Sequence, residues 1–356
     1  MTQSKNYVGT YWKNKPVSFK NVFSTNTIEN NLKNIKPYNL DKLNLPENWK
    51  LENVTYSEEI ENFLKQNDYY TKSFINDVTI MKHFDKIIGV IAGNVYDVVV
   101  YDTKHKYFYC SLLCVDKNYR NKKLSCILMN EMFRQMVSQD VIHGLSINSK
   151  YFPTPITTIR QYIRPFNIEK IIDKKLIKLH IPKESYGRFK MADRSLSHSY
   201  VKLESKYYNS VYLLYKSFVS KCNIYIDYTF EEFSKLLDKV NGFVVVENDK
   251  VIDFFSYYVH DNIAKLFLFS CVNLYPSEML PDILKLTHDE GVDGFMVDDL
   301  HIFEELLNTK EGDESDNESF EQGYELLFVK TVNKYYLNLI NKCCPKLTPK
   351  QVFISH

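Results

Sequence analysis

Residues 111–125 read SLLCVDKNYRNKKLS, and the interpretation of the whole chain starts from this stretch. It begins with the apolar run 112–115, which is typical of a buried strand. A polar turn rich in lysine and arginine follows at 116–123, and apolar residues then recur at helical spacing over 124–136. The stretch therefore predicts a strand, a basic turn and a helix in direct succession.

The basic turn has the chemistry of a phosphate-binding site. A helix N-terminus presents unpaired backbone N–H groups and a partial positive charge, and neighbouring lysine and arginine side chains add to its attraction for phosphate. If the preceding strand ends with free amides, those amides can also stabilise an oxyanion. Basic turns also occur on ordinary solvated surfaces, so the interpretation depends on the rest of the chain.

Length and composition narrow the class of protein. The chain has 356 residues, a length typical of two domains, and its formal net charge is +1. A charge so close to zero argues against general binding to nucleic acid or to a membrane surface. The seven cysteines lack regular spacing, which indicates reduced thiols in a cytoplasmic protein. Cys343 and Cys344 lack zinc-site spacing, so no metal is predicted, and no apolar run has the length of a signal peptide or membrane span.

The segments around the opening stretch predict an α+β unit. Residues 57–66 predict a helix with Ile60, Phe63 and Leu64 on one face. The other predicted elements are strands at 86–92, 95–101, 106–115 and 141–147, the helix that ends near 139, and a short helix that contains Ile159, Tyr162 and Ile163.

The second half of the chain repeats this order of elements. A helix is predicted at 205–220, and another begins at Thr229 with the capping-box pattern TFEE. Strands at 243–247, 251–259 and 264–272, a helix at 278–290 and a strand near Phe295 complete the order. The second unit lacks a basic turn like that at 120–123, so we expect one lobe with the site and one partner lobe.

Short stretches along nearly the whole chain resemble the N-myristoyltransferase (glycylpeptide N-tetradecanoyltransferase) family in their order and spacing. The chain looks like a divergent, shortened member. The stretches are Tyr11-Trp12 with Pro16-Val17, NLPENW at 44–49, VYDT at 100–103, LLCV at 112–115, RNKKLSCIL at 120–128, PTPITTIR at 153–160, FVVVENDKVIDFFSYYV at 243–259 and KYYLNLINKCCP at 334–345.

The resemblance implies an α+β chain of two fused acyl-CoA N-acyltransferase-type (acetyltransferase-like) folds in a pseudo-two-fold arrangement. Residues 1–45 would be an arm that contributes to the acyl-CoA site, and 46–190 the acyl-CoA-binding domain. Residues 191–356 would contribute to the peptide site and supply the terminal carboxylate. A cytoplasmic monomer without a permanently bound cofactor, an integral membrane segment or a nucleic-acid partner is expected.

The implied reaction is transfer of myristoyl from myristoyl-CoA, the co-substrate, to the N-terminal glycine amine of peptides or proteins. The backbone amides of Leu112 and Leu113 would form the oxyanion hole, Ser146 would lie near the amine, and the terminal carboxylate of His356 would be the base. A carboxylate suits that role because an α-amino group, whose pKa is about 8, must lose a proton before it attacks. With Leu112 and Leu113, the residues assigned to acyl-CoA are Tyr11, Trp12, Cys114, Val115, Arg120, Asn121, Lys122, Lys123, Leu124 and Ser125.

Departures from the family pattern lie on the peptide side. A short link at 67–86 replaces the family's acidic loop, Gln161-Tyr162-Ile163 replace a Tyr-x-His run, and Val329-Lys330-Thr331 replace a Gly-Asp-Gly loop. The acidic stretch 311–321 reads either as a solvated loop or as a substitute that attracts basic peptides. Two alternatives remain open: an acyl-CoA-binding protein that has lost peptide transfer, and an acyltransferase with another acceptor, such as a lysine amine.

Overall fold

The structure is a computed structural model that describes residues 45–67, 69, 75–149, 155–177, 182–300, 307, 327–340 and 347–354. Tyr11, Trp12, the acidic stretch 311–321 and His356 lie outside the described residues. One sheet of 14 strands organises the molecule, with the path β1-β2-β3-β4-β5-β13-β6-β12-β11-β10-β9-β7. The fold is α+β, as the sequence predicts.

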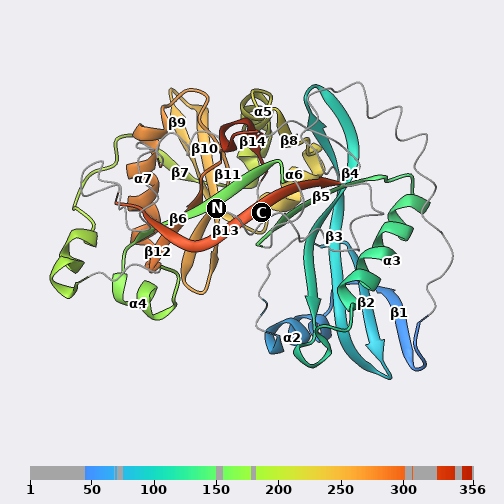
Figure 1. Cartoon of the computed structure of the whole chain (residues 1–356). Helices are drawn as coiled ribbons and strands as arrows, with labels where there is room; N and C mark the ends of the chain where they lie inside the picture. The colour runs from blue at the N-terminus through green and yellow to red at the C-terminus, as the bar shows by residue number, and fades with distance from the viewer. Residues whose placement is uncertain are drawn as a thin grey trace.

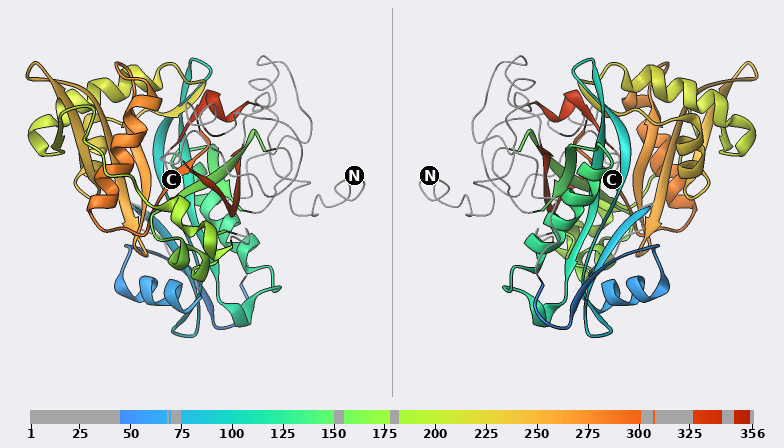
Figure 2. Two further views of the ribbon diagram at one scale, coloured as in Figure 1. Left: turned by 90° about the vertical axis from the view of Figure 1, so that its left-hand side faces the viewer. Right: turned by 90° about the vertical axis from the view of Figure 1, so that its right-hand side faces the viewer.

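Lobe 1 is built on the strands β1 to β5, with one helix on each face of the sheet (Figure 2). The helix α2 packs its apolar face against Leu112 and Cys114, and α3 packs on the opposite face against Leu113. Its elements are β1 (Trp49–Val54), α2 (Glu58–Gln66), β2 (Asp77–His83), β3 (Lys86–Val100), β4 (Thr103–Val115), the 3₁₀ turn η2 (Lys117–Tyr119), α3 (Leu124–Ser138) and β5 (His143–Asn148).

Lobe 2 repeats this plan on the strands β9 to β12. The predicted capping box at Thr229 is confirmed, since its side chain accepts from the Glu232 amide at 3.2 Å and Glu232 accepts from the Thr229 amide at 2.8 Å. The elements are α4 (Ile168–Asp173), β7 (Tyr200–Lys202), α5 (Tyr208–Val219), β8 (Ile224–Ile226), α6 (Phe230–Leu237), β9 (Asn241–Glu247), β10 (Lys250–His260), β11 (Ile263–Ser270), α7 (Pro276–Asp289) and β12 (Gly294–Asp298).

Two strands cross between the lobes and join them (Figure 1). The strand β6 (Thr157–Pro165) follows lobe 1 in sequence but pairs with β12 of lobe 2. Conversely, β13 (Val329–Ile340) follows lobe 2 in sequence but pairs with β5 of lobe 1. Because β6 and β13 also pair with each other, the two lobes share one continuous sheet.

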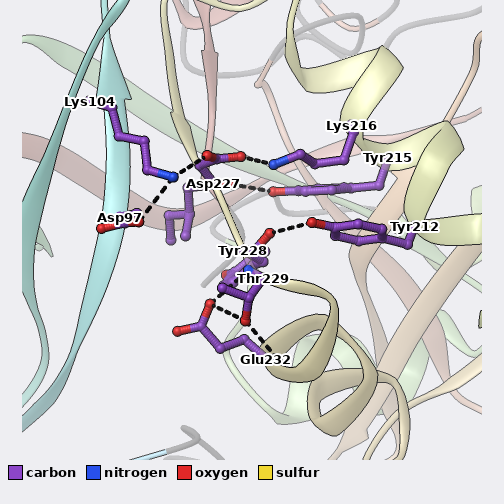
Figure 3. Close-up of polar contacts among 10 residues, drawn as sticks. Asp97, Lys104, Tyr212, Tyr215, Lys216, Asp227, Tyr228, Thr229 and Glu232 are labelled. Carbon is purple, nitrogen blue, oxygen red and sulfur yellow. Dashed lines mark hydrogen bonds and ion pairs between the residues drawn. The ribbon is translucent and has the colours of Figure 1, made fainter. Parts of the chain in front are cut away.

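A cluster of charged and tyrosine side chains fixes α5 of lobe 2 against the β3–β4 hairpin of lobe 1 (Figure 3). Lys104 on β4 contacts Asp97 at 3.0 Å and Asp227 at 2.8 Å, and Asp227 also pairs with Lys216 of α5. The Tyr215 hydroxyl donates to the Ile226 carbonyl at 2.8 Å. The strand β8 also pairs with β3. Together, the side-chain contacts and this strand pairing hold the two lobes in one orientation.

Two predicted elements are wrong. The segment with Ile159, Tyr162 and Ile163 is the strand β6 rather than a helix, because it pairs with β13 on one side and with β12 on the other. The predicted strands 86–92 and 95–101 form the single strand β3, whose pairing with β4 shifts register between Ala92 and Gly93. A side chain at Gly93 would overlap the Tyr109 carbonyl oxygen, so glycine marks a close approach rather than a turn.

The link expected at 67–86 is not a plain loop, since it contains β2, the strand between β1 and β3. This strand pairs on both sides and contributes Val78 and Ile80 to the core beneath α2. The strand was not predicted from the sequence, because only four consecutive residues of it, VTIM, are apolar or β-branched and polar residues stand on either side of them.

Candidate active site

The strands β4 and β5 diverge at the centre of lobe 1. They pair in parallel from Tyr107 opposite His143 to Cys110 opposite Ser146, and β4 then continues without β5 to Val115. Ser111 is the extra residue of a bulge, since Cys110 and Leu112 pair with the adjacent residues Gly93 and Ala92 of β3. The divergence places Leu112 and Leu113 on a stretch of β4 whose pairing with β5 has ended.

Buried polar atoms without partners surround this divergence. Among the described residues, neither Ser111 Oγ nor Asn338 Oδ1 has a hydrogen-bond partner. Asn338 on β13 is 4% exposed and pairs directly with Ser146 of β5, whose Oγ accepts from the Asn148 amide group at 2.8 Å. A buried acceptor without a partner costs about 1–3 kcal/mol, so these atoms indicate the position of a polar ligand group.

The basic turn after β4 is preformed for an anion. Asn121 and Lys123 have left-handed backbone conformations, with φ of 66° and 62°. Such alternation turns successive backbone N–H groups toward a common concavity. The helix α3 begins at Leu124, has no acidic residue in its first turn, and receives no side-chain cap from Lys123. Its N-terminal amides therefore carry a partial positive charge that neither the cap residue nor an acid in the first turn neutralises.

The basic side chains of this turn give it a positively charged, solvent-exposed surface. Arg120, Lys122 and Lys123 are exposed, and Lys122 Nζ lies 4.8 Å from the centre of the Tyr119 ring. Asp116, which caps η2, is buried; burial favours its neutral form, but the Asn118 amide and Lys86 outweigh burial and lower the pKa of the carboxyl. The ionised Asp116 thus fixes the start of the turn while the outer face stays basic.

The cysteines at the divergence are neutral thiols. Burial raises the pKa of Cys110 to about 12 and the pKa of Cys114 to about 11. A thiol acts as a nucleophile only when it ionises, and neither cysteine ionises appreciably near neutral pH. The arrangement therefore favours chemistry on backbone amides and a bound amine rather than a covalent thiol intermediate.

A buried ion pair that was not predicted from sequence lies on the lobe 2 side. Lys265 Nζ on β11 is 3.3 Å from Asp298 Oδ2 on β12, with both side chains about one-tenth exposed. Burial alone would lower the pKa of Lys265, but Asp298, Tyr258 and Tyr335 together raise it above the ordinary value. Gln161 donates to Asp298 at 3.0 Å and accepts from Asn333 at 2.9 Å, so the replaced family position belongs to this network.

Some of the predicted site residues lie close together in the structure, and others lie outside the described residues. Leu112, Leu113 and Ser146 meet at the divergence, and Cys114 and Val115 lead from it to the turn at 120–125. The sequence analysis did not identify Ser111 or Asn338 as site residues, although Ser111 is the first residue of the stretch 111–125. Near the C-terminus, β14 (Val352–Phe353) pairs with β8, and Ile354 is 2% exposed.

The described residues contain no group of three or more His, Cys, Asp or Glu side chains that could hold a metal ion. Within the same part of the chain, no helix combines the length and apolar character needed to cross a membrane.

We predict that reversing two charges in the turn weakens binding of a phosphate-bearing ligand. The variant Lys122→Glu/Lys123→Glu is expected to raise the dissociation constant of CoA about 30-fold, since each lost charge-assisted contact costs roughly 1 kcal/mol. Isothermal titration calorimetry measures this dissociation constant. The control Lys206→Glu/Lys235→Glu makes the same charge change at exposed positions of lobe 2. Equal weakening in both variants would show that only the overall charge matters.

Comparison with known proteins relates residues 9–159 to one family. The model of the "Myristoyl-CoA:protein N-myristoyltransferase, N-terminal domain" matches residues 9–159. The chain is 28% identical over 162 residues to the glycylpeptide N-tetradecanoyltransferase of Saccharomyces cerevisiae, which is 42% of this chain and 36% of the relative. It is 24% identical over 294 residues to the putative glycylpeptide N-tetradecanoyltransferase 2 of Arabidopsis thaliana, covering 77% and 68% of the two chains.

Solved structures agree on the fold across nearly the full length. The crystal structure of S. cerevisiae N-myristoyltransferase with bound myristoyl-CoA superposes with a TM-score of 0.72. The match covers 96% of this chain and 94% of that chain at 17% sequence identity. The two-lobed architecture is therefore shared, while most side chains differ.

Proposed function

The chain belongs to the N-myristoyltransferase family, which its residues 9–159 match, and from this premise we propose that it transfers a myristoyl group from myristoyl-CoA to an N-terminal glycine amine. The observation that carries the proposal is the β4–β5 divergence with its unpartnered acceptors Ser111 Oγ and Asn338 Oδ1. A bound amine can donate to these acceptors, and an oxyanion formed beside it would accept from the backbone amides of Leu112 and Leu113. The basic turn lies on the same strand-to-helix connection.

In the proposed reaction, the CoA phosphates lie against the turn at 120–125 and the α3 N-terminus. The thioester carbonyl oxygen points to the amides of Leu112 and Leu113, which donate to it as it becomes an oxyanion. Losing one such donor typically costs on the order of 3 kcal/mol in the transition state. Tyr11 and Trp12 complete the acyl-CoA site in this proposal, and residues 46–190 and 191–356 act as the two domains.

The acceptor amine lies near Ser146 and Asn338. Its nitrogen attacks the thioester carbon after the terminal carboxylate of His356 takes a proton. The tetrahedral intermediate then collapses, the carbon–sulfur bond breaks, and CoA leaves as a thiolate that is protonated by the released proton or by water. The neutral state of Cys110 and Cys114 supports this direct route, because neither thiol is ionised to compete with the amine.

A second candidate is transfer to a different amine. In the place of the family's Tyr-x-His run, Ile163 stands where the resemblance leads us to expect an imidazole, and Gln161 stands where it leads us to expect a tyrosine. Gln161 donates to Asp298, the partner of Lys265. Different side chains at this place change which substrate residues can follow the acceptor amine. A lysine-containing peptide with a blocked N-terminus is therefore the informative competitor substrate.

The experiment that tests the function is CoA release from myristoyl-CoA by the purified chain, followed with a thiol reagent. A panel of N-terminal glycine peptides is compared with the same peptides N-acetylated and with N-acetylated peptides that contain one lysine. Release only with free glycine amines is the expected result. Release with the lysine peptides would support the second candidate, and tight binding of myristoyl-CoA without any release would support a binding protein.

A further inference from the structure

The carboxylates near the acceptor side of the proposed site are already paired with cations. Asp298, at the end of β12, lies 3.3 Å from Lys265 and accepts from Gln161 at 3.0 Å. The next residue, Asp299, is fully buried, accepts from the Arg160 amide at 2.7 Å and lies 4.0 Å from the Arg160 guanidinium. A basic side chain of a substrate would therefore meet carboxylates whose charge is already compensated.

Two lysines of β13 have no such compensation. Lys330 and Lys334 are exposed, and neither forms an ion pair with any residue that the structure describes. In the β13–β6 ladder, Lys330 lies opposite Tyr162 and Lys334 lies opposite Arg160. Lys334 Nζ also lies 5.6 Å from the centre of the Tyr336 ring. The side chains of Arg160, Lys330 and Lys334, here named the basic row, therefore place positive charge along one pair of strands.

The strand register puts the basic row on the same face of the sheet as the proposed amine site. Asn338 of β13 lies opposite Ser146 of β5, and Lys334 lies opposite Arg160 of β6. Directly opposite residues of paired strands share a face, and so do alternate residues of one strand. Asn338, Tyr336 and Lys334 therefore follow one another along a single face of β13.

Exposure increases along this face of β13 with distance from the amine site. Asn338 is 4% exposed, Tyr336 is half-buried and Lys334 is exposed. The four residues between Asn338 and Lys334 correspond to about 13 Å of strand. An extended peptide advances by nearly the same length per residue, so a peptide whose amine lies at Asn338 brings its fifth residue to Lys334.

We propose that the acceptor is a peptide segment with acidic side chains at about its fifth and sixth residues, and that the basic row selects it. The inference rests on the proposed function for the position of the acceptor amine. An acidic side chain at this place meets Lys334 and Lys330, whereas a basic one meets like charge. Because exposed ion pairs are individually weak, the selection is a difference in affinity between peptides rather than an absolute requirement.

Peptide binding tests the inference without any transfer step. Fluorescently labelled peptides of equal length, all with a free N-terminal glycine, carry two aspartates, two asparagines or two lysines at their fifth and sixth residues. Their affinities are measured by fluorescence anisotropy in the presence of a non-cleavable thioether analogue of myristoyl-CoA. The aspartate peptide is expected to bind about tenfold more tightly than the lysine peptide, and high salt is expected to reduce the difference.

Two controls separate a local contact from overall charge. The variant Lys330→Glu/Lys334→Glu is expected to reverse the order of affinities, whereas Lys206→Glu/Lys235→Glu makes the same charge change at exposed positions of lobe 2 and is expected to preserve it. A further peptide has its two aspartates moved to its last two residues. It keeps the net charge of the first peptide, and it is expected to lose the tighter binding.

A reversal confined to Lys330→Glu/Lys334→Glu, together with weaker binding of the moved-aspartate peptide, supports the inference. Equal binding of the peptides, no binding of the aspartate peptide, or the same reversal in the lobe 2 variant overturns it. Tighter binding of the lysine peptide by the wild type also overturns it, and is the result expected if the acidic stretch 311–321 attracts basic peptides.

CoA release is measured separately on the same peptides, so the two proposals fail in different ways. Release that does not depend on the charge of the peptide contradicts the selection of acidic acceptors and leaves the proposed function intact. Charge-selective binding without release from myristoyl-CoA contradicts the proposed function and leaves the selection of acidic peptides intact.

Discussion

Converting the terminal carboxylate of His356 to a carboxamide is expected to lower the rate of myristoyl transfer about 10²- to 10⁴-fold. The amine proton then has no base of suitable strength, because a neutral amide does not accept a proton near neutral pH. Binding of myristoyl-CoA is expected to persist, since the phosphate and oxyanion donors lie on β4 and the turn after it. Single-turnover measurement of CoA release separates the two effects.

The matched pair of proteins comes from one intein fusion at His356. Hydrolysis of the intein thioester leaves the carboxylate, and release with ammonia leaves the carboxamide, so the two proteins differ in one functional group. Rising pH is expected to restore part of the carboxamide protein's rate, because more of the glycine amine is then unprotonated. Equal rates at neutral pH would assign the base elsewhere.

The second large effect concerns stability. Asp298→Ala is expected to lower the free energy of unfolding by about 3 kcal/mol, because it leaves the Lys265 ammonium buried without its partner. The double variant Lys265→Met/Asp298→Leu removes both charges and is expected to recover most of the loss. Chemical denaturation of the three variants measures these differences.

An exposed pair of the same residue types serves as the control. Lys285 and Asp289 lie 2.7 Å apart on α7, with Asp289 half exposed, so Asp289→Ala is expected to cost less than about 1 kcal/mol. A similar cost for Asp298→Ala would contradict the importance of burial. The raised pKa of Lys265 also predicts a sign: its contribution to stability is present below the unfolded-state pKa and declines as pH rises through the folded-state pKa.

The environment of Gln161, near the proposed acceptor site, could be anticipated from the sequence only in part. The unusual Gln161 was visible as a departure from the family pattern, but its hydrogen bonds to Asp298 and Asn333 were not. These partners come from β12 and β13, which are far from β6 in the chain. Hydrogen-bond networks across neighbouring strands depend on sheet order, and sheet order is not a local property.

Sequence alone determined the features that depend on neighbouring residues. The apolar run before the basic turn, the helix at 124–138 and the capping box at Thr229 follow from periodicity and from side chains that bond the adjacent backbone. The repeated order of strands and helices followed from the same patterns, whereas the family was inferred from the resemblance of short stretches in their order and spacing. The helix expected around Ile159 was wrong because Ile159, Tyr162 and Ile163 stand at helical spacing by sequence, while pairing with β12 and β13 makes the segment a strand.

The tertiary structure alone decided where chemistry can occur. The bulge at Ser111, the end of β4–β5 pairing, and the exchange of β6 and β13 between the lobes all depend on register between distant segments. A strand carries its side chains in its own sequence, but its partners decide which of its amides a ligand can reach.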